Sequence, residues 1–132
     1  MFENIIGNED NKKYLEAAIK SNKIPHSFMF VGIPGIGKKL FAKEFAKNIL
    51  CNSKEDIIKF DAGSHPDFRI IEPDGTSIKI NQVREIQTRI AEKPVLADKK
   101  IYIIDDANLM TEESQNCFLK TLEEPPEYAI II

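Results

Sequence analysis

Hydrophobic residues along this chain occur in two patterns: short continuous runs, and longer stretches in which they recur every three or four positions. Continuous runs are typical of strands buried on both faces, and the second pattern is typical of helices with one buried face. Such runs, together with the polar residues that flank or interrupt them, predict strands at residues 27–31, 67–71, 100–104 and 128–132. Because they alternate with helical stretches, the pattern predicts an α/β fold with a parallel sheet.

The helical stretches are bounded by ordinary start and stop signals. Asn and Thr side chains cap helix starts by accepting backbone N–H groups, and proline ends a helix. The predicted helices cover 9–20, 38–50, a stretch capped by Asn81 that reaches Ala91, and a stretch capped by Thr111 that ends before Pro125. Residues 51–66 are polar and are predicted to be irregular.

The most specific chemical signal is a candidate phosphate-binding loop. Residues Gly32 to Lys38 fit the pattern G-x-x-x-x-G-K and lie between a predicted strand and a predicted helix. Glycines, here Gly32, Gly35 and Gly37, let backbone N–H groups turn toward phosphate oxygens. The helix N-terminus and Lys38 would add positive charge, so the loop predicts a nucleotide-binding site.

The residue after this lysine departs from the pattern. A working loop carries Ser or Thr there, because that hydroxyl is a ligand of the Mg²⁺ ion that bridges two phosphates. This chain has Lys39, which has donors but no acceptor and whose charge opposes a cation. We therefore expect binding of ATP or ADP with Mg²⁺ to be weak.

The second half of the candidate site shows another departure. Residues 101–104 are apolar and are followed by Asp105 and Asp106, which resembles the Mg²⁺-orienting strand of P-loop ATPases. In similar ATPases a Glu beside the first acid polarises the attacking water, and Asp106 is one methylene shorter. A misplacement of about 1 Å can cost on the order of 100-fold in rate. We assign no catalytic residue and expect no independent enzymatic activity.

Composition and charge exclude several classes. The 132 residues carry a formal net charge of −3, which argues against a general basic surface for nucleic acid. Two cysteines are too few for a disulfide scaffold, and no apolar run approaches the ~18 residues of a membrane span. The sequence lacks a signal-peptide pattern at its start. We expect a cytoplasmic protein with no membrane partner.

Several segments, in their order along the chain, resemble bacterial clamp-loader AAA+ subunits. They are Phe2 to Asn8, Ile24 to Phe30, Ala46 to Cys51, His65 to Phe68, Ile78 to Arg84 and Leu119 to Pro126. The resemblance implies a three-layer P-loop fold of the AAA+ type, with residues 128–132 between the phosphate-loop strand and the strand at 100–104. It also implies a largely structural role in loading the sliding clamp onto primed DNA during replication. The implied partners are gamma/tau and delta subunits in a five-subunit ring.

The resemblance also indicates what residues 1–132 lack. Clamp-loader subunits continue beyond the fourth strand into a sensor residue, an arginine finger, and lid and oligomerisation domains. The chain is therefore interpreted as an incomplete N-terminal AAA+ domain. Many relatives have four clustered cysteines that bind zinc; here only Cys51 matches, so we expect no zinc and no other bound metal.

Other interpretations remain at this stage. Arg84 and Arg89 are candidates for facing DNA, although a solvated helix surface is the favoured interpretation. An ATP-hydrolysing gamma/tau-like subunit or a helicase-loader ATPase would carry Thr or Ser at position 39 and Glu at position 106. A P-loop small-molecule kinase would also need the hydroxyl, together with an Arg-rich lid.

Overall fold

The centre of the protein is a parallel sheet of three strands. The computed structural model describes residues 1–3, 5–32, 35 and 37–132. Strands β1 (Phe68–Ile71), β2 (Lys100–Ile104) and β3 (Ala129–Ile131) lie in that order, with β2 in the middle. In the register of the sheet, Ile101 is opposite both Phe68 and Ile130. The parallel sheet and the α/β fold expected from the sequence are confirmed.

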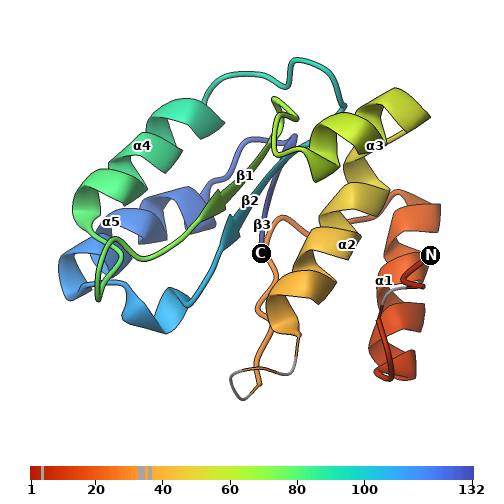
Figure 1. Ribbon diagram of the computed structural model, residues 1–132. Helices are drawn as coiled ribbons and strands as arrows, with labels where there is room; N and C mark the ends of the chain where they lie inside the picture. The colour runs from red at the N-terminus through yellow and green to blue at the C-terminus, as the bar shows by residue number, and fades with distance from the viewer. Residues whose placement is uncertain (4, 33–34, 36) are drawn as a thin grey trace.

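Helices cover both faces of the sheet and give the protein three layers (Figure 1). Helices α1 (Glu9–Ser21), α2 (Lys38–Leu50) and α3 (Lys54–Asp61) lie on one side. Helices α4 (Ile80–Ile90) and α5 (Glu112–Glu123) lie on the other, and a short 3₁₀ turn at Ala107–Leu109 precedes α5. None of the helices in the described ranges is long and apolar enough to cross a lipid bilayer.

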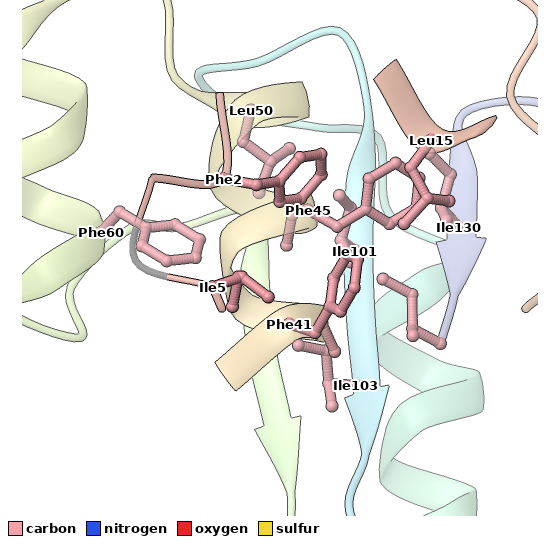
Figure 2. Close-up of a cluster of buried hydrophobic side chains, with 13 residues drawn as sticks. Phe2, Ile5, Leu15, Phe41, Phe45, Leu50, Phe60, Ile101, Ile103 and Ile130 are labelled. Atoms are coloured by element: carbon pink, nitrogen blue, oxygen red, sulfur yellow. The ribbon is translucent and has the colours of Figure 1, made fainter. Parts of the chain in front are cut away.

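The larger of two hydrophobic clusters joins α2 to the sheet. Phe41 and Phe45 of α2 pack with Ile101 and Ile103 of β2 and with Ile130 of β3 (Figure 2). Alternate residues of a strand point to opposite faces, so the residue between the two isoleucines of β2 belongs to the other layer. That residue is Tyr102, which is buried against α4 and α5 in the second cluster. Strand β2 is therefore covered on both faces.

The end of the chain lies where the family resemblance placed it, between residues 26–28 and β2. The Phe28 amide donates to the Ile131 carbonyl at 2.8 Å, and the Ile131 amide donates to the His26 carbonyl at 2.8 Å. The strand predicted at 27–31 is wrong, because only Ser27 forms a bridge. Strand β3 has three residues and its pairing stops at Phe28, which leaves Met29 and Val31 84% and 81% exposed.

Two further sequence expectations were wrong in detail. Residues 54–61, expected to be irregular, form α3, whose N-cap Ser53 accepts a hydrogen bond from the Asp56 amide at 3.2 Å. Acidic residues in its first turn also favour a helix there. Asn81 is not a cap, because α4 begins one residue earlier and its N-cap is Lys79. The predicted cap of α5 is confirmed, since Thr111 accepts from the Ser114 amide.

A buried carboxylate fixes the loop that leads into β2. Asp67 is only 1% exposed and comes directly before β1. One of its oxygens accepts the Val95 amide at 2.6 Å, and the other accepts the Leu96 and Ala97 amides, both at 2.7 Å. A carboxylate is suited to this position because it only accepts hydrogen bonds. The motif His65 to Phe68 thus has a structural role that sequence reasoning did not assign.

We predict that Asp67→Asn destabilises the protein by about 2 to 4 kcal/mol, because an amide NH₂ group would face a backbone donor and the charge would be lost. Urea unfolding at neutral pH measures this change in the free energy of unfolding. The control is Asp98→Asn at an exposed carboxylate of the same loop, which should change stability by less than about 0.5 kcal/mol. Equal effects of the two substitutions would contradict the assigned role of Asp67.

Candidate functional site

The predicted phosphate loop leads directly into α2. Ile33, Pro34 and Ile36 lie outside the described residues, so the loop is described at its glycines and lysines. Gly35 and Gly37 have φ angles of +85° and +92°, a left-handed conformation that favours glycine. Gly37 is the N-cap of α2, and among the described side chains none caps this helix. The first-turn N–H groups of α2 can therefore bind an anion.

Lys38 lies across the loop. Its Nζ atom donates a hydrogen bond to the Gly32 carbonyl at 2.5 Å, which joins the two ends of the predicted loop. A hollow of about 250 Å³ lies beside it and is lined by Tyr14 of α1 and by Phe28 and Phe30. The two left-handed glycines and the start of α2 are suited to phosphate oxygens, and binding of a nucleotide here stays a prediction.

Lys39 makes contacts that decide the metal chemistry of the site. Its Nζ atom lies 2.5 Å from an oxygen of Glu72 and 3.5 Å from an oxygen of Asp105. The hydrogen bond to Glu72 raises the pKa of Lys39 above its ordinary value, against a smaller opposing effect of burial. The same hydrogen bond lowers the pKa of Glu72. At neutral pH the site thus holds an ammonium group between two carboxylates.

These residues do not fit a bound Mg²⁺ ion. Mg²⁺ needs oxygen ligands in an octahedral arrangement, and position 39 supplies an ammonium group instead of a hydroxyl. The carboxylate of Asp105, which would orient the ion, already faces that ammonium group. Within the part of the chain that the structure describes, no three His, Cys, Asp or Glu side chains gather to hold a metal.

Asp105 and Asp106 follow β2 but differ in their surroundings. Asp105 is half-buried, and its amide donates to the Ile71 carbonyl at 2.9 Å, which ties it to the end of β1. Asp106 is exposed and has φ +54° and ψ +52°. Asp is among the few non-glycine residues enriched in this left-handed conformation. The shorter acid at position 106 therefore suits the backbone of this turn.

Sequence reasoning missed Glu72 as a member of the site. It follows β1 as Asp105 follows β2, and the two strands are parallel neighbours. Its carbonyl accepts a hydrogen bond from Nε2 of Gln82 in the first turn of α4 at 2.7 Å. An acidic residue directly after a predicted parallel strand was the available signal, because such strand ends meet at one edge of a sheet.

Arg84 and Arg89 lie in a different layer. Both are exposed on α4, which covers the face of the sheet opposite α2 (Figure 1). The Nε atom of Arg89 lies 4.0 Å from an oxygen of Glu85 on the same helix. The structure does not bring these arginines to the phosphate loop, and contact with DNA stays a prediction.

Cys51, the one residue that matches the zinc cysteines of related subunits, ends α2 as its C-cap and is half-buried. Burial raises the pKa of its thiol, with the nearby Asp56 charge acting in the same direction. Burial thus disfavours the thiolate form that would bind a metal. The expectation that the protein binds no zinc stays a prediction.

Comparison with known proteins agrees with this fold. A sequence model of the family described as "DNA polymerase III, delta subunit" matches residues 7–132. The chain belongs to the DNA polymerase III delta-subunit family. The delta' subunit of DNA polymerase III from Bacillus subtilis is 34% identical over 121 residues, which cover 86% of this chain and 37% of the relative.

Other relatives of this delta-subunit family member are gamma-type subunits. The gamma/tau subunit of DNA polymerase III from Mycoplasma genitalium is 36% identical over 141 residues, covering 99% of this chain and 23% of the relative. The crystal structure of a gamma subunit-related protein from Thermotoga maritima superposes with a TM-score of 0.72 at 28% identity. That match covers 89% of this chain and 37% of the other, so the chain spans well under half the length of these relatives.

We predict a pH-dependent contribution of the Lys39–Glu72 pair to stability. Because the folded pKa of Glu72 is lowered, the contribution is present above the ordinary value of 4.5 and is lost as pH falls through the folded value. Because the folded pKa of Lys39 is raised, the contribution is present below 10.5 and is lost as pH rises above it. The side chains of Lys39 and Glu72 are 41% and 58% exposed, so solvent screens the pair and its contribution is below about 1 kcal/mol.

Urea unfolding of the wild-type protein and of Glu72→Gln measures this contribution. The two proteins should differ at pH 7 and converge once the pH falls below the lowered folded pKa of Glu72, where the side chain at position 72 is uncharged in both proteins. The difference at pH 7 should also shrink at high salt. A control, Glu123→Gln on the exposed end of α5, should show no such convergence. A Glu72→Gln effect that is independent of pH would contradict the ion pair.

Proposed function

We propose that this chain is the AAA+ P-loop portion of a delta'-type clamp-loader subunit of the DNA polymerase III holoenzyme. In this role it takes its place in a ring with gamma/tau and delta subunits and helps to load the sliding clamp onto primed DNA in the cytoplasm. The observation that carries the proposal is the Lys39 ammonium group at 3.5 Å from Asp105, in a chain of this family. It supports a subunit that keeps the fold of a nucleotide site without its metal chemistry.

Three features support a structural role over hydrolysis. Position 39 lacks the hydroxyl that would bind Mg²⁺, and Asp105 is engaged by an ammonium group. The acid at position 106 is shorter than the Glu of similar ATPases. Together these features argue against ATP hydrolysis by this chain, so ATP bound elsewhere in the ring would supply the energy.

A gamma/tau-like ATPase is the second candidate. It is favoured by gamma/tau relatives that are 34% to 36% identical over nearly the whole of this chain. Lys39 and Asp106 argue against it, because ATP-hydrolysing subunits of this type resemble the chain but keep Thr or Ser and Glu at these positions. Family membership gives no support to a small-molecule kinase.

Reconstitution of clamp loading separates the two candidates. The full-length protein is mixed with purified gamma/tau and delta subunits, sliding clamp and primed DNA, and each subunit is omitted in turn. We expect loading to require this protein, and the protein alone to show no ATP turnover above the buffer control. Loading that persists without it would contradict the clamp-loader role, and steady ATP turnover by the protein alone would favour the gamma/tau-like alternative.

A further inference from the structure

We propose that the Lys39 ammonium group takes the place of the divalent cation at this site. Lys39 thereby prevents Mg²⁺ from binding there. The proposal rests on the proposed function only in treating residues 32–39 as a phosphate loop. It goes further in naming a built-in cation and in assigning Glu72 as its principal counter-charge. The chain itself then supplies the positive charge at the site.

The Lys39 ammonium group lies close to both acids of the site. Its Nζ atom lies 2.5 Å from Glu72 and 3.5 Å from Asp105, and it joins the first turn of α2 to the ends of β1 and β2. The Lys39 side chain is 41% exposed, whereas Asp105 is 27% exposed. The ammonium group therefore lies over the half-buried acid that would orient a metal, on the side from which α2 approaches.

The Lys39 ammonium group and a divalent cation would compete for the same carboxylate oxygens. A divalent cation at this point would need the oxygens of Asp105 and Glu72 and would meet a positive charge within a few ångströms. Lysine has no lone pair to offer while it is protonated, so it cannot join the coordination shell. Lysine is protonated in the neutral range at its ordinary pKa, and the hydrogen bond to Glu72 raises the pKa of Lys39 further. Lys39 and a metal ion thus exclude each other.

Hydrogen bonds of the backbone hold the two acids in place without Lys39. Glu72 is held by the hydrogen bond from Gln82 to its carbonyl, and Asp105 by the bond from its own amide to Ile71. Both acids therefore stay at neighbouring strand ends when the side chain at position 39 is changed. Threonine at this position would add a hydroxyl to two carboxylates already in place, and Mg²⁺ and Mn²⁺ accept such oxygen ligands with water completing the shell.

The test is Mn²⁺ binding, measured by electron paramagnetic resonance on the purified protein without nucleotide or other subunits. We expect no specific binding to wild-type protein and a new Mn²⁺ site in Lys39→Thr. Adding Glu72→Gln to Lys39→Thr should weaken this site by about tenfold or more. The control, Lys43→Thr, removes the same charge from α2 one turn further on and should create no site.

The outcomes separate this proposal from the clamp-loader role, because the titration involves no other subunit. A folded Lys39→Thr protein that binds no Mn²⁺ would overturn the proposal, as would Mn²⁺ binding of equal strength in the wild type. The wild-type protein also provides a test that needs no variant. Selective broadening of the Glu72 and Asp105 amide signals by Mn²⁺ in its NMR spectrum would overturn the proposal, and undisturbed signals would support it.

Discussion

Burial of β2 on both faces is the constraint on which the rest of the structure depends. Ile101 and Ile103 face α2, and Tyr102 faces α4 and α5. Parallel strands need crossover connections, and the helices in these connections cover both faces of the sheet. All strands then end at the same edge, and α2 begins beside that edge. The meeting of Lys39, Glu72 and Asp105 follows from this arrangement.

The charges at that edge explain how the site can exist without a metal. In a working P-loop the cation neutralises phosphates and is oriented by an acid after a neighbouring strand. Here the chain places its own positive charge there, and the pKa values of Lys39 and Glu72 shift apart in the direction expected of an ion pair. The helix N-terminus and the left-handed glycines remain suited to phosphate. The site thus keeps the features that suit phosphate, while a lysine takes the place of the metal.

The parts of the fold that the sequence predicts well are those determined locally. The run at 100–104 is β2, and the stretch from Lys38 to Leu50 is α2, because burial on two faces or on one face leaves a clear period in the sequence. The strand expected at 27–31 depends on a neighbour that pairs only as far as Phe28, which no local pattern shows. The start of α4 at Ile80 was missed because Lys79, an unusual cap residue, precedes it.

In the candidate site, too, the residues fixed by local sequence could be predicted and those that depend on distant contacts could not. The glycines, Lys38 and the substitution at Lys39 could be identified from spacing, because a phosphate loop is contiguous. Glu72 could not be assigned, since its contact with Lys39 spans 33 positions of the chain and depends on the register of β1 against β2. Asp67 was missed for the same reason, because its three amide donors lie about 30 residues away.

The central claim, that Lys39 occupies the position of the cation, is tested most directly by a high-resolution crystal structure of the protein grown with ADP and Mg²⁺. The account predicts Nζ of Lys39 between Glu72 and Asp105, with no metal coordinated by Asp105, whether or not phosphate groups lie on the loop. A Mg²⁺ ion bound through Asp105, with the Lys39 side chain displaced from both carboxylates, would contradict it.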